Sequence, residues 1–168
     1  MPSLANRTRV LVLRHHHEEP RPSNTARIAA LALQNIQLVE WVPRTPPDVE
    51  ALLANLRPAW VLYPGEGNVD PSREKPATLV VLDATWKQAR KMLHHHPQLL
   101  RLPRWGLPAT GALRPRLRQS EDPRARSTLE AIADALTLLE GPEIGDPLHR
   151  LHDTLVQRVR RARGLPPP

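Results

Sequence analysis

Cysteine and phenylalanine are both absent from this chain of 168 residues, and tyrosine occurs only once. Without cysteine, disulfide bonds and thiolate metal sites are excluded. No apolar run approaches the ~20 residues that cross a bilayer, and the first nine residues lack the apolar core of a signal peptide. We therefore expect a cytoplasmic protein that has no membrane partner.

Basic residues and prolines are abundant instead. The chain has 24 Lys and Arg against 17 Asp and Glu, a net charge of +7, a pI near 11.1 and 20 prolines. That balance favours a polyanionic partner, either nucleic acid or an anionic surface. The length fits one domain over residues 1–168, with a core at about 9–163 and a Pro-rich C-terminal tail.

The centre of the pattern is an unbroken apolar run at residues 79–82, which ends on Asp83. Such a run is typical of a strand buried on both faces of a parallel sheet. Thr85 then predicts a helix N-cap, and Gln88 completes a capping box. Asp83 would thus lie where a strand's carboxyl end meets a helix N-terminus, the usual ligand position in α/β sheets. The alternative is a second helix-capping acid.

Strands and helices alternate along the rest of the chain. We expect strands at 9–14, 38–42 and 59–63, and helices from Ser23 or Asn24 to 33, from Asp48 to 56, from Ser127 to 140 and at 147–163. The last helix would be amphipathic, with Leu148, Leu151, Leu155 and Val159 along one face. Pro97 should end the central helix, and a loop with a short strand should follow at 99–107. This order predicts an α/β fold with a mainly parallel sheet and helices on both faces.

Three blocks carry a resemblance to a known family: residues 83–92 with Asp-Ala-Thr-Trp, residues 19–28 with Arg-Pro-Ser-Asn-Thr, and Leu117-Arg118 with residues 127–131. In order and spacing they resemble the DTW-domain family. The resemblance implies transfer of a 3-amino-3-carboxypropyl group from S-adenosylmethionine, as co-substrate, to N3 of a uridine in tRNA, releasing methylthioadenosine. It also implies a SPOUT-like sheet with a C-terminal trefoil knot.

The chain departs from the family at two points. Many members carry an N-terminal cysteine-rich, zinc-binding segment, and none is expected here because cysteine is absent. Pro115 stands where many members have a tyrosine, so an aromatic contact at that position is not expected.

The family motifs imply site residues at matching positions of this chain. The catalytic set is Asp83, Thr85 and Trp86, the cofactor-binding set is Thr25, Leu62, Pro64, Leu82, Leu102 and Ser127, and the RNA-binding set is Arg27, Lys87, Arg90, Lys91, Arg116 and Arg118. Chemically, a carboxylate can act as the general base that removes the N3 proton of uridine. Two simpler alternatives stay open: Trp86 facing the core, and Asn24 as an ordinary cap beside a solvated Arg27.

Positive charge gathers beside Asp83 in the sequence. Ten Lys and Arg and two acidic residues lie between Lys87 and Arg126. A phosphate backbone lying across the site would account for that concentration, although part of it would be solvated surface.

Two histidine triplets, at 15–17 and 94–96, suggest a metal site because imidazole suits zinc or nickel. Consecutive side chains are expected to point in different directions, so we expect no metal. His149 and His152 are expected at the surface.

Two other functions remain open at this stage: an RNA methyltransferase on the same scaffold, or a non-catalytic basic RNA-binding protein. The oligomeric state is also open.

Overall fold

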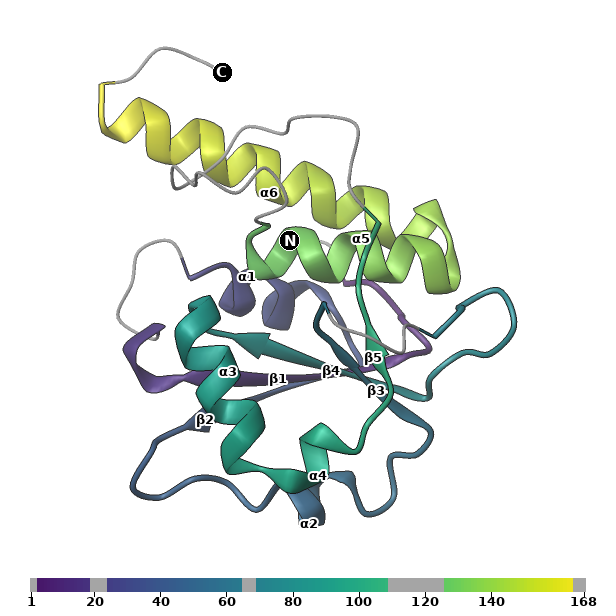
Figure 1. Ribbon diagram of the computed structural model, residues 1–168. Coiled ribbons are helices and arrows are strands. Elements are labelled where there is room, and N and C mark those ends of the chain that lie inside the picture. Colours follow the sequence, from purple (N-terminus) through teal and green to yellow (C-terminus); the bar gives the residue numbers. More distant parts are fainter. Residues whose placement is uncertain (1–2, 19–23, 65–68, 109–125, 165–168) are drawn as a thin grey trace.

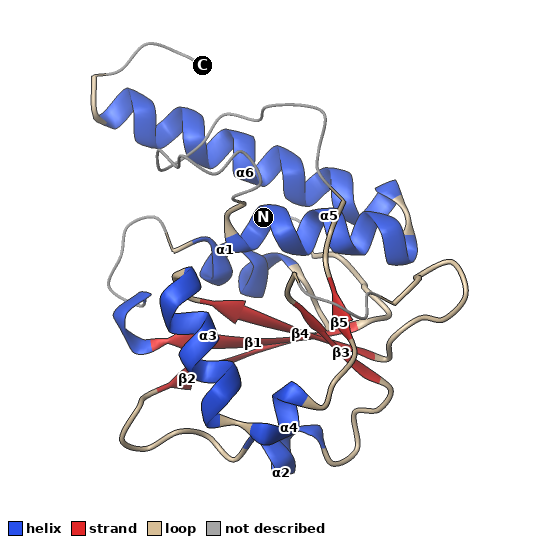
Figure 2. Ribbon diagram, viewed as in Figure 1, coloured by secondary structure: helices blue, strands red, loops and turns tan. Residues whose placement is uncertain are grey.

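The computed structural model describes residues 3–18, 24–64, 69–108 and 126–164. Its centre is a sheet of five strands, β1 (Arg9–His15), β2 (Ile36–Trp41), β3 (Ala59–Leu62), β4 (Thr78–Asp83) and β5 (Arg104–Trp105), in the order β2-β1-β4-β3-β5. Every pairing between these strands is parallel, which confirms the α/β prediction (Figure 2).

Helices cover both faces of the sheet (Figure 1). The first face carries α1 (Thr25–Ala32), α5 (Thr128–Glu140) and α6 (Pro142–Ala162), and the second carries α2 (Val49–Leu53), α3 (Trp86–His95) and α4 (Pro97–Leu100). A 3₁₀ turn, η1 (His16–Glu18), follows β1. Within the described residues, no helix is long and apolar enough to cross a membrane.

The two faces have separate cores because side chains alternate along each strand. On β4, Leu79 and Val81 face α1 and α5, whereas Val80 faces α3 and α2. All three are at most 3% exposed. Burial of such a side chain contributes about 1.5–3 kcal/mol, so the continuous apolar run that predicted β4 is also what places it in the middle of the sheet.

The helix starts agree closely with the sequence. Asn24 caps α1 and Asp48 caps α2. Thr85 with Gln88, and Ser127 with Glu130, each form a complete capping box at α3 and α5. These predictions succeed because a cap satisfies backbone N–H groups within four residues, which is information local to the sequence.

The last helix differs from the prediction. It begins at Pro142 rather than Pro147, so Pro147 lies inside it. Its buried face is also rotated: Leu148, His152 and Val156 are fully buried, whereas Leu151 and Leu155 are only half-buried. Packing against α5 therefore outweighs both the helix-breaking tendency of proline and the leucine pattern.

The chain after α3 also differs in detail. Pro97 ends α3 as expected but opens a further helical turn, α4, where a loop was expected. Proline suits the first turn of a helix, where its missing N–H needs no partner. The short strand expected in this region is confirmed as β5.

The connections that leave the neighbouring strands β1 and β4 run in opposite directions. The chain leaves β1 toward β2 on one side, and it leaves neighbouring β4 toward β5 on the other side. The connections run through α1 on the first face and through α3 and α4 on the second. In open α/β sheets, ligands bind outside the carboxyl ends of the strands at such a divergence. Here it lies beyond the ends of β1 and β4.

Candidate functional site

Asp83 is the last residue of β4, and it is 7% exposed. Its Cα pairs with that of Arg14 near the end of β1, so it lies directly at the divergence of the two connections. Its Oδ1 accepts a hydrogen bond of 2.5 Å from the Thr128 hydroxyl at the start of α5. A hydroxyl that donates to a carboxyl oxygen restricts the rotation of that group. The sheet and α5 therefore hold a carboxylate in a fixed position at this edge.

Three helix N-termini gather at the same edge. In Figure 1, α1, α3 and α5 all begin at the end of the sheet where the central strands finish. The Thr25 hydroxyl accepts from the Leu129 backbone N–H at 3.2 Å, which ties the start of α1 to the start of α5. Helix N-termini carry partial positive charge and free N–H groups. The edge is therefore suited to hold a group with negative charge.

Trp86 opens α3 and is 51% exposed. The alternative that it faces the core is therefore wrong: the helix starts beyond the strand end, so its first side chain lies outside the sheet. Its ring meets Tyr63, just after β3, edge to face with centroids 5.7 Å apart. An exposed indole held by a second aromatic ring offers a stacking surface for a base.

The expected cofactor residues divide into two groups. Leu62 and Leu82, both half-buried, lie at the ends of β3 and β4, and exposed Pro64 follows β3 closely. Thr25 and Ser127 lie at the starts of α1 and α5. These five therefore lie at the edge that carries Asp83.

Leu102 does not join them. It is 3% exposed in the core beneath α2, α3 and α4, ahead of β5. Pro103, which follows it, accepts from the Val61 backbone N–H inside the sheet. Leu102 is therefore a packing residue away from the carboxyl ends of the strands.

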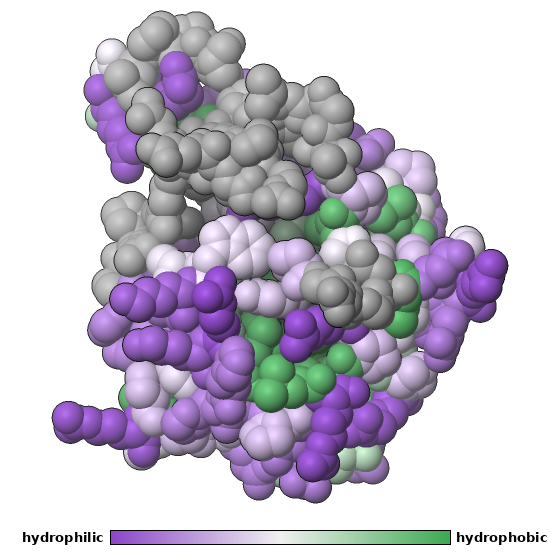
Figure 3. Space-filling view, in the orientation of Figure 1, coloured by the Kyte–Doolittle hydropathy of each residue, from purple (hydrophilic) through white to green (hydrophobic). Residues whose placement is uncertain are grey.

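The expected RNA-binding side chains in the described part of the chain are exposed: Arg27 on α1, and Lys87, Arg90 and Lys91 on α3. Hydrophilic residues gather over α3 on the face shown in Figure 3, beside a hydrophobic patch. Arg116 and Arg118 lie outside the described residues, as does the segment 19–23 of the family motif.

The first histidine triplet contradicts the expectation that its side chains diverge. His15 ends the strand and His16 begins a 3₁₀ turn, so the backbone changes direction between them. The ring centroids of His16 and His17 are 4.0 Å apart, and those of His15 and His16 are 4.5 Å apart. Side-chain divergence holds for a continuous strand or helix, and this segment is neither.

In the second triplet, residues 94–96, the last residue, His96, has a structural role. His96 is buried, and its Nε2 accepts a hydrogen bond of 2.8 Å from the Trp41 indole. Burial lowers the pKa of His96, and the neighbouring His95 lowers it further. A neutral ring is what this contact requires, because a protonated His96 could not accept the hydrogen bond.

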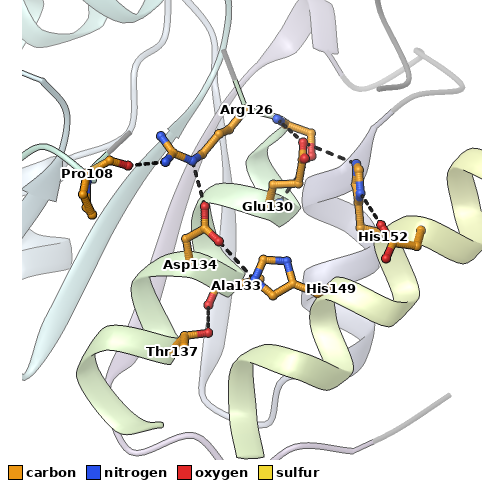
Figure 4. Close-up of polar contacts among 10 residues, drawn as sticks. Pro108, Arg126, Glu130, Ala133, Asp134, Thr137, His149 and His152 are labelled. Atoms are coloured by element: carbon orange, nitrogen blue, oxygen red, sulfur yellow. Dashed lines mark hydrogen bonds and ion pairs between the residues drawn. The ribbon is translucent and has the colours of Figure 1, made fainter. Parts of the chain in front are cut away.

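His149 and His152 are buried, not on the surface as expected. Figure 4 shows them facing α5, where His149 Nε2 lies 3.0 Å from Asp134 and His152 Nε2 lies 3.3 Å from Glu130. Arg126 also donates to Asp134 at 2.7 Å and to the Pro108 carbonyl. Burial acts to raise the pKa of Asp134, but the contacts with His149 and Arg126 outweigh it and lower that pKa.

Sequence reasoning missed Thr128 and Tyr63. Thr128 follows a recognised N-cap, yet its partner Asp83 is 45 residues away, and only the fold brings them together. Tyr63 is the single tyrosine of the chain and is the last residue of the strand predicted at 59–63, whereas β3 ends one residue earlier, at Leu62. An aromatic residue at the end of a predicted strand is the signal that was available.

Two comparisons with known proteins identify the family of this chain. Residues 1–160 match the DTW domain. The tRNA-uridine aminocarboxypropyltransferase 2 of Drosophila melanogaster is 31% identical over 166 aligned residues, which cover 92% of this chain and 65% of that protein. The chain thus spans about two thirds of the length of that relative, and no solved structure matches it. With the Asp-Ala-Thr-Trp motif at the carboxyl end of a central strand, the chain belongs to the DTW-domain family.

Proposed function

We propose that this protein transfers the 3-amino-3-carboxypropyl group of S-adenosylmethionine to N3 of a uridine in tRNA. The observation that carries the proposal is the position of Asp83, a buried carboxylate at the divergence of β1 and β4. Family membership and the name of the Drosophila relative support the same reaction.

The edge fits the methionine end of the co-substrate. The carboxylate of the S-adenosylmethionine amino-acid chain needs positive potential, which the N-termini of α1, α3 and α5 supply. Half-buried Leu62 and Leu82, with exposed Pro64, offer apolar contact and backbone groups for the adenosine. Ser127 and Thr25 support this region mainly through their helix contacts, because Thr25 already accepts from Leu129.

Asp83 acts as the general base in this proposal. The carboxylate takes the proton from N3 of uridine, and the N3 electron pair attacks the γ-carbon of the amino-acid chain. The bond between that carbon and the sulfonium breaks, its electron pair goes to sulfur, and methylthioadenosine leaves. General-base assistance contributes about 10²–10⁴-fold to the rate. The Thr128 hydroxyl holds the carboxylate in position.

Alignment decides which carbon reacts, since the sulfonium carries three. The exposed Trp86 ring, fixed against Tyr63, suits a uridine base turned out of its RNA stack. Lys87, Arg90 and Lys91 on α3, with Arg27 on α1, then provide cations for the adjoining phosphates. Arg116 and Arg118 complete the proposed RNA-binding set on the strength of the family resemblance.

We also propose the SPOUT-like trefoil knot that the family implies. Its support is the return of the chain from edge strand β5 to the middle of the sheet, where Thr128 meets Asp83. Stretching single molecules from both ends tests this. A knotted chain should reach a shorter final contour length than 168 residues allow, and the full length would contradict the knot.

The reaction is tested by incubating the protein with tRNA and S-adenosylmethionine. Nucleoside mass spectrometry should show an aminocarboxypropyl gain on uridine, with methylthioadenosine released. A methyl gain with S-adenosylhomocysteine would replace the proposed chemistry with methylation. Tight tRNA binding without modification of any tRNA would contradict the enzyme and favour an RNA-binding protein.

A further inference from the structure

The three imidazoles of the first histidine triplet lie within reach of a single ion. One ligand nitrogen from each of His15, His16 and His17 lies within 4.8 Å of the other two. Around one Zn²⁺ with Zn–N distances of about 2.0–2.1 Å, tetrahedral geometry places such nitrogens about 3.3 Å apart. His17 is exposed and His16 half-buried, so rotation of these two side chains can close the remaining distance.

Two ring nitrogens of this cluster, His15 Nδ1 and His16 Nδ1, differ in their hydrogen bonding. His15 Nδ1 accepts a long hydrogen bond of 3.3 Å from the His17 backbone N–H, so its lone pair points toward the turn. His16 Nδ1 is buried and has no hydrogen-bond partner in the part of the chain that the structure describes. Buried polar atoms normally have a hydrogen-bond partner. A metal ion bound to His16 Nδ1 would supply the partner that this atom lacks within the described residues.

We propose that His15, His16 and His17 bind one divalent transition-metal ion, with Zn²⁺ as the ion that three imidazoles suit best. Three histidine ligands leave a fourth tetrahedral position open, and the exposure of His17 places that position toward solvent. Trp41 covers the other side of the cluster, with its ring 5.3 Å from that of His15. An apolar neighbour of this kind limits the access of water to the ion.

The ion would fasten the end of β1 to the turn that follows it. The Glu18 carbonyl at the end of that turn accepts from Asn24 Nδ2 at 3.2 Å, and Asn24 caps α1. The metal site thus supports one of the three helix N-termini at the Asp83 edge. The proposal does not depend on the transfer reaction, because it concerns binding alone.

The second triplet provides a control within the same chain. His94 Nδ1 lies 2.7 Å from the Arg90 carbonyl, and His96 Nε2 is taken by the Trp41 indole. Two of its three members therefore have partners already, and the triplet forms no metal-ligand group within the described residues.

The test is calorimetric titration of the full, tag-free chain with Zn²⁺ after removal of metals by chelation. The wild type should bind one equivalent. His17→Ala and His16→Ala should each lower the Zn²⁺ affinity about tenfold or more, whereas His94→Ala should leave it unchanged. Circular dichroism would verify that all three variants are folded.

Co²⁺ gives a second, spectroscopic readout. The wild type loaded with Co²⁺ should show the strong visible absorption of a four-coordinate site, and His17→Ala should lose it. The proposal is overturned if the wild type binds no Zn²⁺ at micromolar concentration. It is equally overturned if His94→Ala weakens binding as much as His17→Ala does.

Discussion

The geometry at Asp83 depends on the hydroxyl of Thr128, which donates to its carboxylate. Removing that donor leaves the carboxylate in place but frees it to rotate. Thr128→Val, which keeps the shape of the side chain, should therefore lower kcat of the proposed reaction about tenfold or more and leave KM for tRNA nearly unchanged. Thr128→Ser, which keeps the donor, should restore most of the rate.

Steady-state kinetics with the two variants distinguish positioning from simple packing. Serine lacks the methyl group and valine retains it, so a packing role would make Thr128→Ser the worse variant. If Thr128→Ser is less active than Thr128→Val, Thr128 does not position the Asp83 carboxylate through its hydroxyl.

The sequence predicts the contacts of some residues and not those of others. Thr85 and Ser127 are recognisable as caps because each bonds to a residue three positions away. The Thr128–Asp83 and Trp41–His96 contacts join residues 45 and 55 positions apart, and no local pattern encodes them. The histidine cluster was missed because one change of backbone conformation after His15 reverses the expected side-chain directions.

Helix α3 presents a basic face to solvent, and its charges can be tested one at a time. Lys87→Gln should weaken tRNA binding and reduce the slope of log affinity against log salt by about 1, as expected for one lost phosphate contact. Arg161→Gln on α6 is the matched control, since Arg161 is also exposed but lies in the last turn of the last helix. Equal effects of the two variants in a filter-binding titration would contradict an RNA face on α3.

Helices α5 and α6 approach closely at Gly145. A Cβ there would lie 1.7 Å from the Thr137 hydroxyl oxygen and 2.9 Å from the Ala133 carbonyl oxygen. Gly145→Ala should therefore lower the free energy of unfolding by about 1–3 kcal/mol despite the better helix propensity of alanine.

Thr137→Ala provides the complementary change in a double-mutant cycle. It removes the hydroxyl but not the Ala133 carbonyl, so the double variant should recover part of the loss. Chemical denaturation measures all four proteins. A Gly145→Ala variant as stable as the wild type would mean that the two helices can move apart at little cost.

This close approach also explains why α6 was predicted less well than the strands. The pattern of leucines placed Leu151 and Leu155 inward, but the close contact at Gly145 selects the face with Leu148, His152 and Val156. Buried histidines paired with Glu130 and Asp134 occupy positions that a hydrophobicity pattern assigns to solvent.

The whole molecule should lose stability in acid, and His96 contributes to this loss just below its ordinary pKa of 6.5. Its pKa is lowered in the folded state, so between the ordinary value of 6.5 and the lowered value the unfolded chain binds more protons. Stability is therefore fully present above about pH 6.5 and falls as the pH drops below it. His96→Gln keeps an acceptor for Trp41 without titrating, so it should flatten the dependence of unfolding free energy on pH between 5 and 7.

Asp134 acts lower in the pH range. Its pKa is lowered in the folded state, so its contribution is present above the ordinary value of 3.8 and is lost as the pH falls below that value. Urea denaturation at a series of pH values measures both effects. Identical pH profiles for the wild type and His96→Gln would contradict the role given to His96.

At the scale of the whole molecule, alternating strands and helices predicted an α/β fold with helices on both faces, and the structure confirms it. The order of the strands could not be predicted, because it depends on which hydrophobic faces pair across long distances in the sequence. Yet that order creates the divergence of β1 and β4 and so defines the candidate site.

The role of Asp83 as general base is tested by the single-turnover rate of tRNA modification by Asp83→Asn. Asparagine keeps the shape of the side chain and an oxygen that accepts from Thr128, but it cannot take the N3 proton. We expect a loss of about 10²–10⁴-fold in rate, with tRNA and S-adenosylmethionine affinities within a few-fold of the wild type. A rate within a few-fold of the wild type would show that Asp83 is a structural acid and that the base lies elsewhere.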